Sequence, residues 1–211
     1  MTLAGRILAG AGIIAALVLA APFALLLGGA YKMMYMPAES MAPTLEVGDR
    51  FVARMNAPAT LERGDIVIVD AGNGRLYVKR VAGLPGDRIG LREGIVLLNG
   101  RPVPQRLMGE DRVAWSVDGS PARRLAEQFP GESSPHQIYD SGPSIGDDFA
   151  EEPVAPGHLF LLGDNRDHSA DSRFAHANQG LAQVPLTDLR GVPWIFSATS
   201  GRHRIGDSAS H

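Results

Sequence analysis

The chain has 211 residues, a net charge of −3 and no cysteine. Without cysteine it has no thiol nucleophile, no thiolate metal site and no disulfide framework. Acidic residues gather between positions 109 and 155, where ten of them accompany three arginines, and no concentrated basic face of the kind that binds nucleic acid is present. The 25 glycines and 15 prolines fit a loop-rich β fold better than a helical bundle.

A run without charge opens the chain. Ile7 to Ala30 is 24 residues long, and a helix of that length spans about 36 Å, enough for a hydrocarbon core of about 30 Å. A cleaved secretory signal is the alternative, because Arg6 gives the run a basic start, but the apolar region of such a signal normally has about 7–15 residues. We therefore predict a short N-terminal end at 1–6 and one transmembrane helix at 7–30.

Short apolar runs bounded by turn signals follow. Gly72-Asn73-Gly74 is a strong hairpin signal, because these residues accept the positive φ that the turn requires. This spacing predicts a mostly β, antiparallel catalytic domain over residues 31–200. The expected strands are Arg50–Met55, Ile66–Val69, Arg75–Val81, Ile95–Leu98, His158–Leu162 and Pro193–Phe196.

Residues 105–155 form an acidic extension or a β-ribbon insert. Trp115 is a candidate strand start, and Ala122 to Phe129 is a short helix or strand. For the acids of this segment we expect a solvated loop. The polar tail at 201–211 is predicted to be disordered.

Ser40 lies between Pro37 and Pro43, just after the apolar run. A serine hydroxyl becomes a nucleophile only when a base removes its proton. Histidine is the usual base, but none of the six histidines stands in a nucleophile-elbow context, and Ser40 lacks the glycines of Gly-x-Ser-x-Gly. The sequence therefore gives no support to a Ser-His-Asp triad.

Lysine is the alternative base, and the chain has only Lys32 and Lys79. Lys32 lies at the expected membrane edge. Tyr77, Lys79 and Val81 share one face of a strand, which surrounds the ammonium with apolar neighbours. Burial can lower the pKa of a lysine by several units from about 10.4, and only the neutral amine accepts a proton near pH 7. The alternative is a solvated lysine on a strand face.

The loop at 163–173 has five charged side chains in eleven residues. A cation site is one interpretation, but the EF-hand pattern is not met, because Phe174 stands where the twelfth position needs glutamate. Two arginines also compensate three aspartates. We favour a salt-linked loop held rigid against an active site.

These blocks, in this order, resemble bacterial type I signal peptidase, the membrane-anchored Ser-Lys enzyme that removes signal peptides from exported proteins. The resemblance spans residues 31 to 196. The matching stretches are Ser40–Leu45 with Gly48-Asp49, Arg63–Val67, Tyr77–Val81 with Gly83–Asp87, and Gly163–Arg173.

The resemblance implies a role for each matching residue. Ser40 is the nucleophile and Lys79 the general base, and Ser169 orients the lysine amine. Supporting roles fall to the salt pair Asp171 and Arg173 and to the polar residues Asp164 and Arg80. An extended substrate pairs with two strand edges, whose binding residues are Tyr35, Met36, Pro37, Ala38, Leu76, Tyr77 and Val78. Small residues are expected at substrate positions −1 and −3.

The same resemblance implies the setting. It predicts an antiparallel β domain of the signal-peptidase type, carried on one transmembrane helix, on the outer side of the bacterial inner membrane. The partners are preprotein signal peptides, membrane lipid and the secretion machinery, and no metal or other cofactor is needed.

Two departures from the family keep alternatives open. Ala38 stands where some members have a serine that helps the oxyanion hole, which leaves open a catalytically weak binding module of the same fold. The insert at 105–155 leaves open a specialised processing protease for a pilus or conjugation substrate.

Overall fold

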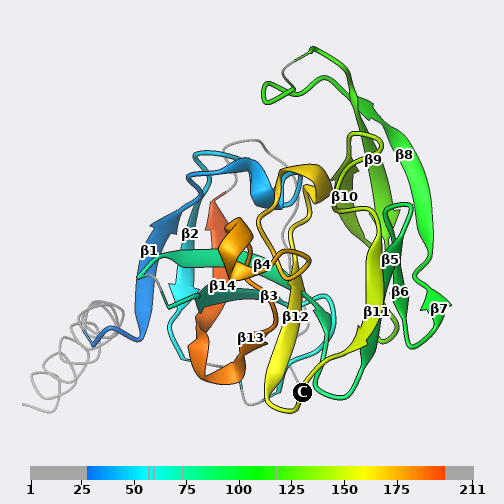
Figure 1. The fold of residues 1–211 in the computed structure, drawn as a ribbon. Coiled ribbons are helices and arrows are strands. Elements are labelled where there is room, and N and C mark those ends of the chain that lie inside the picture. Colours follow the sequence, from blue (N-terminus) through cyan, green and yellow to red (C-terminus); the bar gives the residue numbers. More distant parts are fainter. Residues whose placement is uncertain (1–27, 57, 59, 73, 117, 198–211) are drawn as a thin grey trace, which may run out of the picture.

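Three antiparallel β sheets make up the part of the chain that the computed structural model describes, residues 28–197 without 57, 59, 73 and 117 (Figure 1). The largest sheet holds, in order, β1 (Tyr31–Tyr35), β2 (Arg50–Arg54), β14 (Leu189–Ser197), β3 (Ile66–Asp70), β4 (Leu76–Gly83), β12 (His158–Leu162) and β13 (Val184–Pro185). A second sheet holds β11 (Phe149–Pro153), β5 (Arg88–Arg92), β6 (Ile95–Leu98) and β7 (Arg101–Pro102). The third holds β10 (His136–Asp140), β9 (Ala122–Glu127) and β8 (Gln105–Asp111).

The mostly antiparallel β architecture confirms the fold class expected from the sequence. The predicted hairpin is present: β3 and β4 pair in a register that sets Asp70 opposite Leu76 and Val67 opposite Lys79. The last strand, β14, begins earlier than expected, at Leu189, because Leu189 pairs with Val69 and packs in the core.

The short 3-10 helix η1 (Glu39–Met41) is fixed to the large sheet by methionines. Met36 and Met41 are buried on either side of Ser40 and pack with Phe51 and Ile68 in one apolar cluster. Burial of such a side chain contributes about 1.5–3 kcal/mol. The core therefore fixes the position of this segment around Ser40, the candidate nucleophile turn.

The extension differs from the solvated loop that we expected. Residues 105–155 include β8, β9, β10 and β11, as in the β-ribbon alternative, and within the expected helix or strand at Ala122–Phe129 the residues Ala122–Glu127 form strand β9. Glu127 is fully buried, since it has charged partners inside the fold. Trp115 lies in a turn, not at a strand start, because its ring packs against Tyr139 with ring centroids 5.9 Å apart.

The predicted transmembrane helix at 7–30 falls outside the described residues except for 28–30, and the tail at 201–211 lies wholly outside them. In the described part of the chain, no helix has both the length and the apolar character that crossing a bilayer would require.

The remaining short elements are 3-10 turns. They are η2 (Arg166–His168), η3 (His176–Asn178) and η4 (Leu186–Asp188). The first belongs to the polar loop at 163–173 and packs against η1 and β10.

Candidate active site

Ser40 and Lys79 meet although 39 positions separate them in the sequence. Ser40 lies in η1 and Lys79 in the centre of β4, and Lys79 Nζ is 2.9 Å from Ser40 Oγ. This is hydrogen-bond distance, the first requirement for proton transfer between a nucleophile and its base.

Lys79 is only 2% exposed. Burial lowers the pKa of its ammonium to about 8, although the carboxylates of Asp171 and Asp164 act in the opposite direction. A pKa near 8 leaves an appreciable fraction of neutral amine near neutral pH, so Lys79 can act as a base.

Gly163 brings the polar loop into contact with the nucleophile turn. A Cβ at this position would lie 2.5 Å from the Ser40 carbonyl oxygen and would collide with the Ser169 side chain. Only glycine leaves room for this approach. The Ser169 hydroxyl is buried beside Gly163 and has no hydrogen-bond partner within the described residues, so the expected bond to the Lys79 amine is not formed here.

Arg80 and Asp164 form a buried bidentate pair. The two N–O distances are 2.7 and 2.6 Å, and both side chains are almost inaccessible. Arg80 also donates to the Gly64 carbonyl at 2.6 Å and to the Thr44 hydroxyl at 3.3 Å. The residue after the candidate base is thus tied both to the polar loop and to the segment that follows Ser40.

Asp171 and Arg173 form a second buried pair, with Arg173 Nε and Nη2 each 2.9 Å from the carboxylate. Asp171 also accepts the Gly163 N–H at 3.0 Å. The pairing expected from the sequence is therefore present, and it fixes the beginning of the loop to its end.

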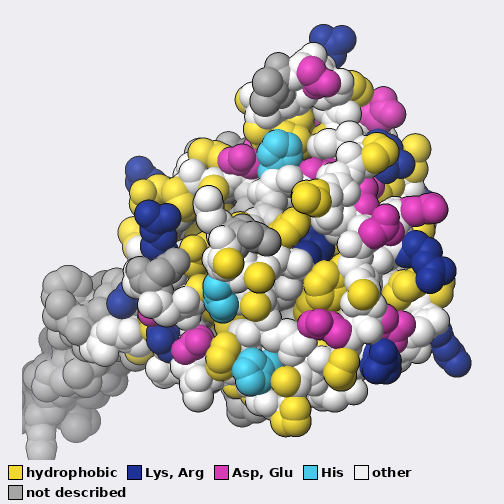
Figure 2. All heavy atoms as spheres, in the orientation of Figure 1, with side chains coloured by type: hydrophobic (Ala, Val, Ile, Leu, Met, Phe, Trp, Pro, Cys, Tyr) yellow, Lys and Arg dark blue, Asp and Glu magenta, His cyan; other side chains and the backbone are white. Residues whose placement is uncertain are grey.

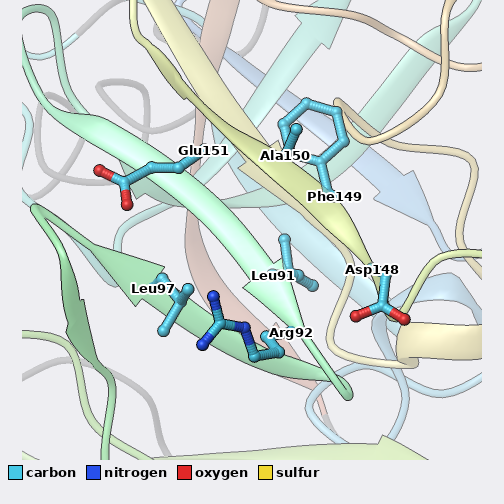
Figure 3. A pocket seen from close by; sticks show the side chains of 7 residues that line it. All are labelled: Leu91, Arg92, Leu97, Asp148, Phe149, Ala150 and Glu151. Carbon is cyan, nitrogen blue, oxygen red and sulfur yellow. The ribbon is translucent and has the colours of Figure 1, made fainter.

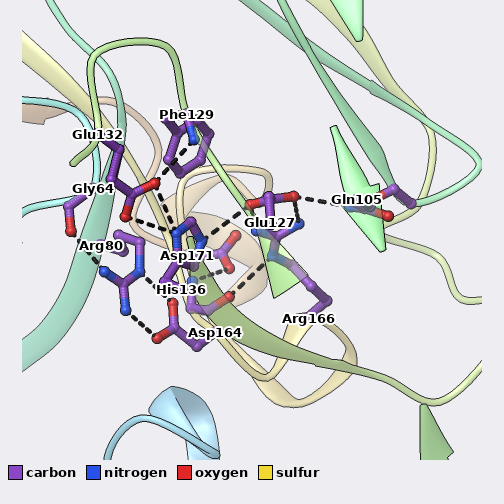
Figure 4. A network of polar contacts seen from close by, with 12 residues as sticks. Gly64, Arg80, Gln105, Glu127, Phe129, Glu132, His136, Asp164, Arg166 and Asp171 are labelled. Atoms are coloured by element: carbon purple, nitrogen blue, oxygen red, sulfur yellow. Dashed lines mark hydrogen bonds and ion pairs between the residues drawn. The ribbon is translucent and has the colours of Figure 1, made fainter. Parts of the chain in front are cut away.

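The charges of Asp164 and Asp171 act on Arg166, but its direct ion pair lies outside its own loop. It pairs instead with Glu127 of β9, and His136 of β10 lies on the same carboxylate (Figure 4). Asp167 accepts the Ser141 N–H at 2.6 Å. The loop is consequently held from outside, by β4, β9 and β10.

Three residues at this site were not assigned a role from the sequence. Asn165 is fully buried against the Ser40 turn, Glu127 binds Arg166 of the loop from the extension, and His136 binds Glu127. The sequence of the loop contains Asn165, but it does not show which residues Asn165 contacts in the fold. Glu127 lies 39 positions from Arg166, and the sequence around it carries no signal of that contact.

The two expected substrate edges differ in how they present side chains. Pro37 and Ala38 are exposed, whereas Met36 and Val78 are buried in the core cluster below η1. β4 pairs with β3 from Leu76 to Arg80 and with β12 from Arg80 to Gly83, so the ladder with β12 does not include Leu76–Val78.

A surface hollow of about 310 Å³ lies elsewhere, on β5, β6 and β11 (Figure 3). Its lining includes Leu91, Arg92 and Phe149 and none of the candidate catalytic residues. The Ser40–Lys79 pair thus lies outside this hollow, with Ser40 partly exposed and Lys79 buried.

Comparison with known proteins identifies the family of this chain. A family model described as signal peptidase, peptidase S26, matches residues 8–193. The chain belongs to this signal peptidase family. Ser40, Lys79 and the loop at 163–173 all lie inside the matched range of the S26 family.

Two relatives that are named as signal peptidases support the assignment. Signal peptidase I U of Bacillus subtilis (strain 168) is 29% identical over 177 residues, which cover 82% of this chain and 79% of the relative. Signal peptidase I of Bacillus caldolyticus is 32% identical over 161 residues, covering 74% and 76%. A crystal structure of a signal peptidase I from Enterococcus faecalis V583 has a TM-score of 0.36 and 24% identity, covering 64% of this chain and 98% of that one.

Proposed function

We propose that this S26 peptidase is a membrane-bound serine endopeptidase that removes signal peptides from exported preproteins with a Ser40–Lys79 dyad. The observation that carries the proposal is the 2.9 Å contact between Ser40 Oγ and the amine of a lysine that is 2% exposed. A buried amine with a pKa of about 8 has the property that a general base needs.

In the proposed mechanism, neutral Lys79 takes the Ser40 proton while Ser40 Oγ attacks the carbonyl carbon of the scissile bond. The ammonium of Lys79 then protonates the leaving amine, and an acyl-enzyme remains. Neutral Lys79 next removes a proton from water, which hydrolyses the ester and restores Ser40. Ser169 is proposed to orient the amine, since both its side chain and the Ser40 carbonyl lie against Gly163.

The substrate is proposed to bind as an added strand. The edge of β4 at Leu76–Val78 lies outside the ladder with β12, and exposed Pro37 and Ala38 come shortly before Ser40 in the chain. Main-chain hydrogen bonds to such edges hold an extended peptide, while small residues at −1 and −3 fit shallow pockets.

Membrane lipid is a proposed partner. Met33, Tyr35 and Trp194 are 75%, 65% and 55% exposed on β1 and β14. Figure 2 shows hydrophobic side chains over β1, close to where the described chain begins. Exposed apolar side chains next in sequence to the predicted segment at 7–30 fit a domain held at a bilayer. The proposed bilayer face is the outer face of the bacterial inner membrane, where the secretion machinery is proposed to deliver preproteins.

Purified protein in detergent, incubated with a preprotein, tests this function, with the cleavage site read by mass. S40A and K79A should each abolish cleavage while the melting temperature stays within a few degrees of the wild type. K32A is the matched control, because it removes the only other lysine and should cleave normally. Cleavage retained by S40A or by K79A would contradict the dyad.

A further inference from the structure

Asn165 binds the nucleophile turn through two separate groups. Its backbone N–H donates to the Ser40 carbonyl at 3.2 Å, and its side-chain Nδ2 donates to the Glu39 carbonyl at 3.3 Å. One residue of the polar loop thus holds both peptide groups that flank the Cα of Ser40.

The amide orientation follows from what Asn165 faces. With Oδ1 and Nδ2 exchanged, an acceptor would face the Glu39 carbonyl oxygen, itself an acceptor. In the observed orientation Oδ1 is buried without a hydrogen-bond partner in the described structure, and Asn165 is fully buried. An unpaired buried acceptor is unfavourable, so an apolar side chain would suit this place better if packing were its only role.

Asn165 is itself held firmly. The carbonyl of Asp164 accepts the Tyr139 N–H at 2.8 Å, and the Asn165 carbonyl accepts the His168 N–H at 3.1 Å. Tyr139 and Asn165 also form a parallel bridge between β10 and the loop. The side-chain donor is consequently fixed relative to the rest of the fold.

A trans peptide unit is planar, and its C=O and N–H point in opposite directions. The carbonyl of Glu39 belongs to the same peptide unit as the N–H of Ser40. Asn165 Nδ2 and the Ala42 N–H, at 2.9 Å, both hold that carbonyl. The Ser40 N–H must therefore point away from the buried loop, toward the partly exposed side on which Ser40 lies.

Acyl transfer needs hydrogen-bond donors aimed at the oxygen that becomes negative in the transition state. Ala38, two residues before the nucleophile, carries no side-chain donor. The backbone N–H of Ser40 must then provide more of the stabilisation of the oxyanion, so the direction of this N–H matters more.

We propose that Asn165 is a positioning residue, which aims the Ser40 N–H at the developing oxyanion by holding the Glu39 carbonyl. This inference rests on the proposed function. Asn165 makes no hydrogen bond to Lys79 among those recorded, so it acts on the oxyanion and leaves the base unchanged.

The test compares two inhibitors that differ in the oxyanion. A peptide aldehyde ending in alanine adds to Ser40: Oγ bonds to the aldehyde carbon, the C=O becomes a C–O group in the oxyanion position, and the Ser40 proton passes to Lys79. The corresponding peptide acid, a cleavage product, binds without forming that group.

N165A should lower kcat about 10–100-fold with KM changed by no more than about twofold. Its affinity for the aldehyde should fall by the factor lost in kcat, whereas its affinity for the product peptide should stay the same. The rise of its cleavage rate with pH, which reports the deprotonation of Lys79, should occur at the same pH as in the wild type. N165L removes the donor without adding a charge near Lys79, and should show the same pattern.

N99A is the matched control. It removes an asparagine amide that bonds Asp87 away from the site, at a position whose φ of 53° also disfavours alanine. It should lose stability without changing the ratio of aldehyde to product affinity. That ratio does not depend on the fraction of folded protein, so partial unfolding of N165A leaves the test intact.

Equal losses of affinity for aldehyde and product, a shifted pH limb or an unchanged kcat in N165A would each overturn the assignment. Failure of the proposed function would look different: the wild type would not cleave, or S40A would cleave as well as the wild type.

Discussion

In the proposed mechanism the decisive residue is Lys79, and burial is what suits its amine to the role of a base. A solvated lysine is charged at neutral pH and has no lone pair to accept a proton. Burial in β4 lowers its pKa to about 8, while Asp171 and Asp164 limit the decrease. The two acids thus keep the amine basic enough to take the Ser40 proton.

The pH dependence of cleavage follows from this pKa. Below about 8 Lys79 is protonated and inactive as a base, so kcat/KM should rise about tenfold per pH unit and level off as the pH passes about 8. Initial rates between pH 5.5 and 9.5 with one peptide substrate measure the profile. K79R, which stays charged throughout, should show no cleavage at any pH, and a flat wild-type profile would contradict the assignment of the base.

At the scale of elements, the strands that form by local pattern were predictable and the contacts between distant elements were not. Short apolar runs and the Gly72–Gly74 turn predicted β3 and β4 to within two residues at each end. The acids of 105–155 suggested solvated loop, because net charge does not show which acid meets an arginine inside the fold. Glu127 does, and β9 is consequently a support for the loop rather than a free extension.

For the site, the motif blocks identified Ser40, Lys79, Arg80, Asp164, Asp171 and Arg173, which the structure brings together. They could not reveal that Asn165 clamps both peptides around Ser40, since that contact spans 126 positions. They also gave no sign that the direct ion pair of Arg166 is with Glu127. Long-range polar pairing depends on tertiary packing, which a single sequence does not show.

The support given by β9 can be tested with the Glu127–Arg166 pair. E127A leaves the Arg166 guanidinium buried and without its carboxylate, which costs about 3–5 kcal/mol in free energy of unfolding. The Arg166 carbonyl also accepts a hydrogen bond from the Arg173 guanidinium. Movement of Arg166 should therefore shift the loop at 163–173, and the cleavage rate should fall together with the stability. Urea unfolding and initial rates measure both.

Two variants make that experiment specific. E110A removes an exposed acid from β8 of the same sheet and should change the free energy of unfolding by no more than about 0.5 kcal/mol. E127L/R166M removes both charges and should recover most of the stability lost in E127A. If E127A were as stable as E110A, the third sheet would not support the loop at 163–173.

At the scale of the whole molecule, one buried polar network joins the sheets around the active site (Figure 4). It runs from Gly64 and Arg80 on the large sheet through Asp164 to the loop, and from Arg166 to Glu127 and His136 on the third sheet. His136 also contacts Glu132 at 2.9 Å and stacks on Phe129. Its charge is therefore part of what holds the sheets together.

The stability of the molecule should depend on the protonation of His136. Burial and the charge of Arg80 act to lower the pKa of His136, but hydrogen bonds to Glu127 and Glu132 outweigh them and raise it above its usual value. Because the folded pKa lies above the unfolded value of about 6.5, this contribution is fully present below pH 6.5 and is lost as pH rises through the folded pKa.

H136Q keeps hydrogen-bonding groups but carries no charge, so it should be less stable than the wild type by about 1–3 kcal/mol at pH 5.5. The difference should narrow as the pH rises toward 9, because wild-type His136 then also becomes neutral. Urea unfolding of both proteins across this range measures the difference, and H158Q controls for the loss of a histidine outside the network. A wild-type to H136Q difference that stayed constant with pH would show that His136 contributes packing alone, because only a charged imidazole makes the difference depend on protonation.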